Sequence, residues 1–252
     1  MLLQQFGHGE KIELKNLQIY LMKFSFYLIL KKKYFNFKNI KSTFIGHPVY
    51  HIPRRNVKNN YKYIAFLFGS RENEINKLFK YFNYLEKYIN ANHPEYIIFI
   101  PTLPHLRNII EKKISTWKTK TIISNEINNF NSFYDEVFVS ITCSGTASLE
   151  IAKRNVPQLI IYKLNYLTEI ILKLFVKVRY ACLLNIISNK VIIPEIVNSR
   201  LSKKNLLLSF EKLINDNEFR KEQINNVNYF LSKIETNKSP FEISAERIIK
   251  LI

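Results

Sequence analysis

Short runs of β-branched and aromatic residues alternate with helical stretches from Lys41 onward, and this alternation limits the fold more than any other feature. Residues 74–89, between two such runs, carry apolar side chains at the i, i+3, i+4, i+7 spacing of an amphipathic helix. Strands that alternate with helices form a parallel sheet with helices on both faces. We therefore expect an α/β, Rossmann-like doubly wound parallel sheet with strands at residues 43–45, 63–68, 96–100, 121–124, 137–141 and 158–162.

Other segments have the apolar spacing of helices. Residues 106–114 and 146–154 resemble residues 74–89 in this respect and fall between expected strands. After residue 162 the pattern becomes predominantly helical. We expect C-terminal helices at residues 164–178, 203–215, 217–234 and 242–251.

The composition describes a basic, folded chain. It has 252 residues, a formal net charge of +18 and 47% hydrophobic residues, which is too apolar for a disordered protein. Cys143 and Cys182 are far apart in sequence, so they predict neither a disulfide framework nor a cysteine-rich zinc site and favour a reducing, cytoplasmic compartment. The positive charge favours phosphate groups on nucleic acid, anionic lipid or a nucleotide.

The absence of known motifs disfavours a nucleic-acid partner and a metal site. The sequence has no zinc-finger spacing, no RNP-type aromatic motif and no basic region followed by heptads, so we expect no nucleic-acid partner. The five histidines show no metal-ligand spacing, so we expect no metal.

The apolar run at residues 17–30 could be mistaken for a membrane span. It is shorter than the roughly 20 residues that a span needs, it contains Lys23, and its basic cluster at Lys31, Lys32 and Lys33 follows the run. We interpret it as a buried strand or helix, with an interfacial segment on anionic lipid as the alternative.

The first candidate site is the loop directly after the expected strand at residues 63–68. Gly69 permits a tight turn, Ser70 can donate a hydrogen bond to a phosphate oxygen, and Arg71 can hold the phosphate with a charged fork. In an open parallel sheet, ligands bind beyond the carboxyl ends of the strands. The same three residues are also common in ordinary turns.

The second candidate site follows the expected strand at residues 137–141. Gly145 lets backbone approach a ligand closely, and a helix that begins near Thr146 would direct free N–H groups at a diphosphate. Glu150 lies one helical turn further on, where its carboxylate could accept hydrogen bonds from both ribose hydroxyls of a nucleotide or simply face solvent. The G-x-G-x-x-G and P-loop motifs are absent, which disfavours dinucleotide-dependent oxidoreductases and P-loop enzymes.

Taken in order, several motifs resemble those of the lipid-A-disaccharide synthases from residue 44 to the C-terminus. They are F-I-G-H-P at 44–48, F-G-S-R-x-x-E-I at 68–75, S-G-T-A-S-L-E at 144–150, V-P-Q-L-I-I-Y-K at 156–163, L-T-x-x-I at 167–171, V-K-x-x-Y at 176–180, L-L-N-I-I at 183–187 and I-P-E-I at 193–196.

The resemblance implies the donor-binding half of a GT-B-type inverting glycosyltransferase. Such an enzyme transfers a diacylglucosamine unit from UDP-2,3-diacylglucosamine to 2,3-diacylglucosamine 1-phosphate, which yields lipid A disaccharide 1-phosphate and UDP. It would use no cofactor. By the same resemblance, residues 1–40 are a degenerate N-terminal remnant, and residues 41–252 are a Rossmann-like UDP-sugar-binding domain with C-terminal helices.

The resemblance also implies the roles of individual residues. Arg71 would face the diphosphate, Glu150 would hold the ribose, and Asn185 and Glu195 would line the same cleft. The substrate-binding set that we expect is Gly69, Ser70, Arg71, Ser144, Gly145, Thr146, Glu150, Asn185, Lys190 and Glu195.

The sequence departs from the family pattern at several positions. Phe68 and Leu184 replace prolines, and Lys190 offers a point charge where the family has a bidentate arginine. The N-terminal domain, with its acceptor pocket and catalytic carboxylate, has no counterpart, so no catalytic residue is assigned. We expect a truncated fragment that binds UDP-sugar but does not transfer it alone.

The expected partners are the UDP-diacylglucosamine donor, lipid substrate at an anionic membrane surface, and either a second copy of the chain or a separate N-terminal half. The expected location is the cytoplasm of a Gram-negative-type bacterium, peripheral to its inner membrane. The alternative function is a non-catalytic basic module that binds anionic membrane or sugar nucleotide. A sugar-nucleotide epimerase of similar architecture would need an acid or base that the sequence does not identify.

Overall fold

The structure is a computed structural model that describes residues 45–47, 49, 52–55, 60–125, 132–143, 145–163 and 180–249. The remnant expected at residues 1–40, the apolar run at 17–30, Ser144 and the helix expected at 164–178 lie outside the described residues. The chain divides into two compact units. One is Ile52–Ser232, and the other combines Met1–His51 with Lys233–Ile252.

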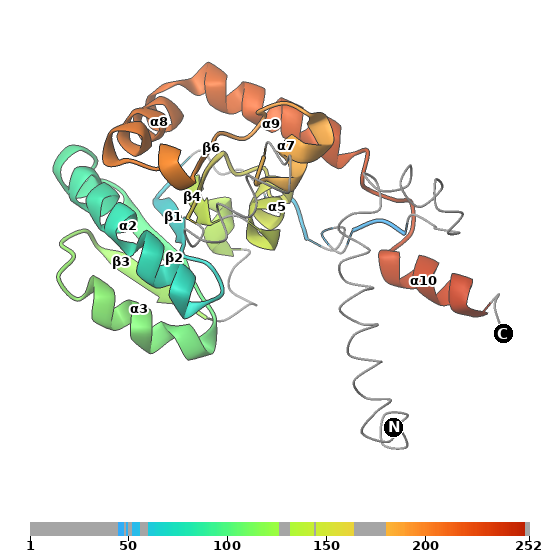
Figure 1. Cartoon of the computed structure of the whole chain (residues 1–252), viewed down its shortest axis with the longest axis horizontal. Coiled ribbons are helices and arrows are strands. Elements are labelled where there is room, and N and C mark those ends of the chain that lie inside the picture. Colours follow the sequence, from blue (N-terminus) through green and yellow to red (C-terminus); the bar gives the residue numbers. More distant parts are fainter. Residues whose placement is uncertain are drawn as a thin grey trace. The chain divides into compact units, whose positions relative to one another are not determined.

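The unit Ile52–Ser232 is built on a six-stranded sheet in which every neighbouring pair is parallel (Figure 1). The strand order is β3-β2-β1-β4-β5-β6. The strands are β1 (Tyr63–Leu67), β2 (Ile97–Pro101), β3 (Thr121–Ser124), β4 (Val137–Cys143), β5 (Gln158–Tyr162) and β6 (Glu195–Val197).

Helices follow most of these strands, as the alternating pattern predicts. In chain order, the helices described in this unit include α2 (Glu72–Asn92), η2 (Pro104–Leu106), α3 (Arg107–Ile114), α5 (Thr146–Lys153), α7 (Leu183–Ser188), η3 (Asn198–Arg200), α8 (Lys203–Asn215) and α9 (Asn217–Leu231). The expectation of a doubly wound, Rossmann-like α/β domain is confirmed.

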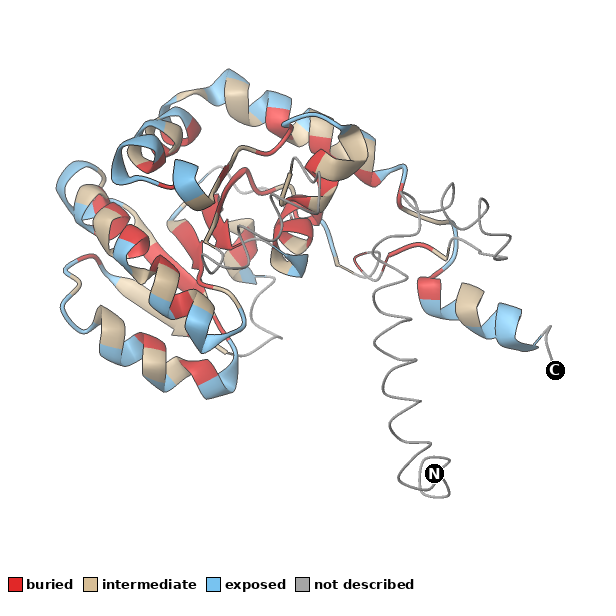
Figure 2. Cartoon of the chain, in the orientation of Figure 1, coloured by how far each residue is buried: buried red, intermediate tan, exposed pale blue. Residues whose placement is uncertain are grey.

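The sheet is buried on both faces. Successive side chains of a strand point to opposite sides, and each set packs into a core of its own. From β1, Ile64 and Phe66 pack into a core that includes residues of α2, α3 and α8. Ala65 and Leu67 face the other side and pack with Ile151 of α5. The buried residues accordingly lie along the strands and along the inner sides of these helices (Figure 2).

Most elements fall where the sequence pattern puts them, and several short ones were missed. The strands predicted at residues 121–124 and 158–162 match β3 and β5, and the helix predicted at 203–215 matches α8. The missed elements include β6 and α7, of three and six residues, and η3, of three residues. None of these is long enough to establish a period in the sequence.

The second unit is described at residues 45–47, 49 and 233–249, which include α10 (Pro240–Ile249). Gly46 adopts φ +86°, and a Cβ atom there would lie 2.6 Å from Oγ1 of Thr236. His47 is buried, and its Nδ1 accepts a hydrogen bond from the Val49 N–H at 3.0 Å. This segment is therefore packed closely against the residues that precede α10.

Candidate functional site

Strand order places the two candidate loops side by side. The chain runs outward from β1 to β2 and β3, then returns to add β4 on the other side of β1. In an open parallel sheet, the crevice for a ligand forms where the strand order reverses in this way. The carboxyl ends of β1 and β4 flank that point, and each is followed by one of the loops that the sequence singled out.

The loop after β1 is folded around the Glu74 carboxylate. Glu74 accepts a hydrogen bond from the Ser70 N–H at 3.0 Å and an ion-paired one from Nη1 of Arg71 at 3.1 Å. Gly69 has φ +104°, and a Cβ atom there would clash with Oε2 of Glu74. Only glycine therefore fits this position without displacing the carboxylate.

The Arg71 guanidinium remains accessible to a ligand. Its side chain is 76% exposed, and an ion pair this exposed contributes only about 0–1 kcal/mol to stability. Moving the Arg71 guanidinium from Glu74 to a bound anion therefore costs little free energy.

The loop after β4 presents backbone to the crevice. Gly145 has φ +124° and ψ −154°, a conformation that is essentially restricted to glycine. Its carbonyl accepts hydrogen bonds from the Ser148 N–H at 3.2 Å and the Ser148 hydroxyl at 2.7 Å, which fixes the first turn of α5. Among the described side chains, none caps the N-terminus of α5, so the amides near Thr146 and the positive end of the helix dipole can accept an anion.

Both loops open into one cavity of about 440 Å³, a volume within the usual range of ligand sites. Arg71, Gly145, Thr146 and Glu150 all contribute to its wall, although they come from two segments more than 70 positions apart in the sequence. The complete lining is Leu67, Gly69, Ser70, Arg71, Glu74, Pro101, Thr102, Leu103, Tyr134, Cys143, Gly145, Thr146, Ala147, Glu150 and Arg154.

Glu150 is a half-buried carboxylate in this wall. Burial raises its pKa above the ordinary value for glutamate, and the positive charge of Arg154 acts in the opposite direction. The Arg154 guanidinium carbon lies 4.6 Å from the centroid of the Tyr134 ring, a cation–π contact. The cavity therefore combines an exposed cation at one loop with a carboxylate whose charge depends on its neighbours.

Several residues of the wall could not be identified from the motifs alone. Thr102 and Leu103 directly follow β2, so the rule that ligands bind at the carboxyl ends of strands would have indicated them. The Thr102 hydroxyl is buried and has no hydrogen-bond partner among the described residues. Tyr134 and Arg154 reach the cavity only through the tertiary fold, although the i, i+4 spacing of Glu150 and Arg154 was a weak signal.

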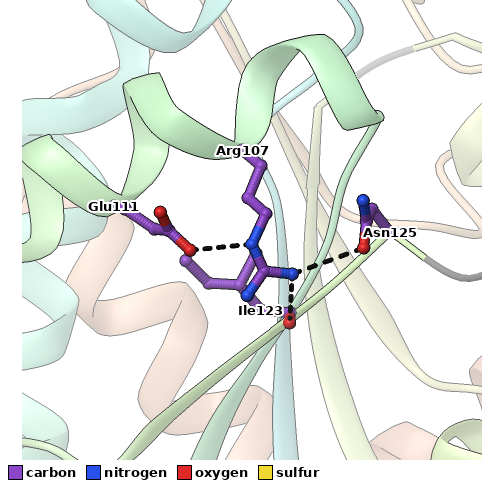
Figure 3. Close-up of polar contacts among 4 residues, drawn as sticks. All are labelled: Arg107, Glu111, Ile123 and Asn125. Atoms are coloured by element: carbon purple, nitrogen blue, oxygen red, sulfur yellow. Dashed lines mark hydrogen bonds and ion pairs between the residues drawn. The ribbon is translucent and has the colours of Figure 1, made fainter.

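The wall that follows β2 is fixed by Arg107 at the start of α3 (Figure 3). Nη1 of Arg107 donates to the Ile123 carbonyl and to Oδ1 of Asn125, each at 3.3 Å, and Nε donates to Oε1 of Glu111 at 2.8 Å. These contacts tie the start of α3 to the end of β3. The loop at residues 102–106 therefore connects β2 to a helix whose first residue is bonded to the end of β3.

Three residues that were expected in the same cleft are not part of the described cavity wall. Asn185 is fully buried, and its side chain bonds the Ile193 carbonyl and the N–H groups of Ile192 and Ile193. The Glu195 carboxylate accepts backbone hydrogen bonds at the start of α7, and Lys190 is exposed. Asn185 and Glu195 were assigned by resemblance, and in this structure their polar atoms bond the local backbone.

Two further features concern metals and membranes. The described part of the chain has no group of three or more His, Cys, Asp and Glu side chains arranged to hold a metal ion. Within the same residues, no helix combines the length and apolar character needed to cross a membrane.

Comparison with known proteins identifies the family. The family model for lipid-A-disaccharide synthetase matches residues 15–249. The lipid-A-disaccharide synthase of Aquifex aeolicus is 30% identical over 210 residues, which cover 81% of this chain and 56% of that protein. The enzyme of the same name from Rickettsia felis is 27% identical over 255 residues, which cover 96% of this chain and 64% of that protein.

Among solved structures, a mutant of S. aureus TarM in complex with UDP has a TM-score of 0.52. The two sequences are 10% identical, and the match covers 78% of this chain and 37% of the TarM chain. The likeness therefore shows a shared fold. The chain spans between half and two-thirds of the length of the two curated relatives named above. Because the family match includes both loops that line the cavity and extends over nearly the whole sequence, this chain belongs to the lipid-A-disaccharide synthetase family.

Proposed function

We propose that this chain holds the nucleotide-sugar donor of a lipid-A-disaccharide synthase reaction. The donor would be UDP-2,3-diacylglucosamine, the acceptor 2,3-diacylglucosamine 1-phosphate, and the products lipid A disaccharide 1-phosphate and UDP. The observation that carries this proposal is the convergence of the loops after β1 and β4 on one cavity at the reversal of strand order.

Each part of the cavity suits one part of a uridine diphosphate. The amides at Gly145 and Thr146 and the Arg71 guanidinium would bind the pyrophosphate, because backbone N–H groups and a charged fork both suit phosphate oxygens. The Glu150 carboxylate would accept hydrogen bonds from the ribose hydroxyls. Gly69 and Ser70 would let the phosphates approach the backbone of the β1 loop.

This arrangement supports one half of the chemistry. Glycosyl transfer needs the departing UDP to be stabilised by fixed donors, which Arg71 and the α5 amides would provide. It also needs a base for the attacking hydroxyl. Of the two carboxylates in the described wall, Glu74 is bound to Ser70 and Arg71, and we assign Glu150 to the ribose.

We therefore propose that the base and the acceptor pocket come from outside the described cavity wall, either in a separate N-terminal half or in a second copy of the chain. The chain by itself should bind the donor nucleotide without transferring the sugar. The proposed setting is the membrane surface, where both lipid substrates would be found.

Isothermal titration of the full chain with UDP tests the donor site. Loss of Arg71 or of Glu150 removes a charge-assisted hydrogen bond worth about 1.5–3 kcal/mol, so Arg71→Ala and Glu150→Ala should each weaken UDP binding by about 10- to 100-fold. Arg247→Ala on α10 and Glu222→Ala on α9 remove exposed charges of the same kinds and serve as matched controls. Their UDP affinity should equal that of the parent chain.

The same titration separates the donor site from the basic-module alternative. If the parent chain releases no binding heat with UDP but sediments with anionic vesicles, and Arg71→Ala and Glu150→Ala do not change that sedimentation, the donor-site proposal is wrong. UDP binding that is equal in the parent chain and both cavity variants would also contradict it.

A further inference from the structure

The Glu74 carboxylate holds two hydrogen-bond donors of the β1 loop that would suit a phosphate. Its Oε2 accepts a hydrogen bond from the Ser70 N–H at 3.0 Å. Its Oε1 accepts one from Nη1 of Arg71 at 3.1 Å. Each carboxylate oxygen thus takes one donor, and two oxygens of a phosphate group could use the same two donors in the same way.

Glu74 lies in the wall of the cavity, beside the loop backbone. It contributes to the lining together with Gly69, Ser70 and Arg71. Its side chain is 16% exposed, whereas that of Arg71 is 76% exposed. Gly69 leaves room for the carboxylate, because a Cβ atom at Gly69 would clash with Oε2. The carboxylate is therefore seated where a phosphate of the donor would approach the backbone of this loop.

The charged side chains of the described wall balance one another. They are Arg71, Arg154, Glu74 and Glu150, two cations and two anions. UDP carries several negative charges, and the proposed function places its pyrophosphate at Arg71. The pyrophosphate would then approach the Glu74 carboxylate as a like charge, which is repulsive at short distance. Glu74 and the pyrophosphate would also compete for the charge of the same guanidinium.

We propose that Glu74 is an internal competitor of the nucleotide: its carboxylate occupies the donors of the β1 loop until the pyrophosphate displaces it. This inference rests on the proposed function, because the displacing ligand is the diphosphate of the sugar donor. Displacement is possible because an ion pair with so exposed a partner as Arg71 is weak. The consequence is that Glu74 weakens UDP binding and so favours the release of UDP as a product.

A purely structural role for Glu74 predicts a different result. Glu74 is the third residue of α2, and a glutamate at this position commonly bonds a backbone N–H just before the helix and fixes its first turn. With that role alone, loss of the carboxylate would loosen the loop that carries Arg71, and UDP would bind equally or more weakly. The sign of the change in affinity separates the two roles.

The test is the UDP affinity of the full chain, measured by calorimetry at two salt concentrations. Glu74→Gln and Glu74→Met both remove the charge and keep a side chain of similar length, so either can be used if the other does not fold. At low salt the folded variants should bind UDP about three- to tenfold more tightly than the parent chain. At about 1 M salt this gain should shrink, because screening weakens both the ion pair and the repulsion.

Glu72→Gln is the matched control. Glu72 is an exposed carboxylate in the same first turn of α2, and it is not part of the described cavity wall. Its loss removes the same charge from the start of the helix without freeing the Ser70 N–H or Arg71. The UDP affinity of this variant should stay within about twofold of the parent value at both salt concentrations.

The outcomes distinguish this inference from the proposed function. If neither the parent chain nor the Glu74 variants bind UDP, the proposed function is wrong and the inference falls with it. If the parent chain binds UDP and the Glu74 variants bind it equally or more weakly, Glu74 only supports the loop. That result, or a gain in affinity that does not change with salt, would overturn the inference and leave the proposed function intact.

Discussion

At the scale of single residues, glycine makes the proposed donor site possible. The whole chain contains only 5 glycines, and Gly69 and Gly145 occupy the two loops that line the cavity. They are needed for different reasons. A side chain at Gly69 would collide with Glu74, whereas at Gly145 a Cβ atom would meet nothing within 4 Å and only the backbone conformation requires glycine.

This difference makes Gly145→Ala a test of backbone conformation without a steric clash. Alanine is strained at φ +124° and ψ −154°, at a cost of about 1–3 kcal/mol, and the loop should relax away from the geometry that presents its amides. UDP affinity should fall at least about tenfold, and the thermal midpoint should fall as well. Calorimetry and thermal unfolding measure both effects. Unchanged affinity would show that the Gly145 backbone does not contact the nucleotide.

At the scale of elements, a buried pair of glutamines joins α9 to the sheet beside α5. The Gln158 N–H donates to Oε1 of Gln223 at 2.7 Å, and Nε2 of Gln223 donates to the Gln158 carbonyl at 3.1 Å. Nε2 of Gln158 also donates to the Ser148 carbonyl at 2.7 Å. Together these bonds connect α9, β5 and the first turn of α5.

Gln223→Ala should therefore destabilise the unit Ile52–Ser232 without weakening the nucleotide site. It leaves the Gln158 N–H and carbonyl buried without these partners, which costs about 2 kcal/mol in the free energy of unfolding. The dissociation constant for UDP should stay within about twofold of the parent value, because Gln223 is not part of the cavity wall. Chemical denaturation with Glu222→Ala as the exposed neighbour tests this, since that control should change stability by less than about 0.5 kcal/mol. A loss of UDP affinity comparable to that of Glu150→Ala would contradict it.

The elements also show what could be predicted from the sequence. Runs such as Tyr63–Leu67 are long enough, and rich enough in β-branched and aromatic residues, to indicate a strand. A glycine directly after such a strand indicates a loop that can bind a ligand. Tyr134 and Arg154 carry no comparable local signal, because they reach the cavity only through packing between distant segments. Asn185 was assigned by resemblance, and a sequence cannot show that its amide groups are already bonded to the Ile192 and Ile193 backbone.

At the scale of the whole molecule, the two compact units should respond differently to acid. His47 belongs to the unit formed by Met1–His51 and Lys233–Ile252, and burial lowers its pKa to about 4 from an ordinary value of 6.5. Between these two pH values the unfolded histidine binds a proton and the folded one does not. The stabilising contribution is therefore complete above pH 6.5 and is lost as the pH falls toward 4.

Acidification from pH 7 to pH 5 should cost this unit about 2 kcal/mol. Protonation of Nδ1 would also remove the acceptor for the Val49 N–H. After correction for the slower intrinsic exchange of amides at lower pH, hydrogen exchange followed by mass spectrometry should show smaller protection factors at residues 233–249 at pH 5 than at pH 7, with a smaller change in the strands of the other unit. In His47→Gln, which cannot acquire the charge, this pH effect should be reduced. An equal loss of protection in both units would contradict the assignment to His47.

A crystal structure of the full chain with UDP would show whether one nucleoside diphosphate occupies the cavity at the reversal of strand order. We predict pyrophosphate oxygens within hydrogen-bond distance of the Thr146 N–H and the Arg71 guanidinium, with the ribose hydroxyls on Glu150. UDP bound at another surface, or in this cavity with its ribose and phosphates away from these three residues, would show that the cavity is not the donor site that we propose.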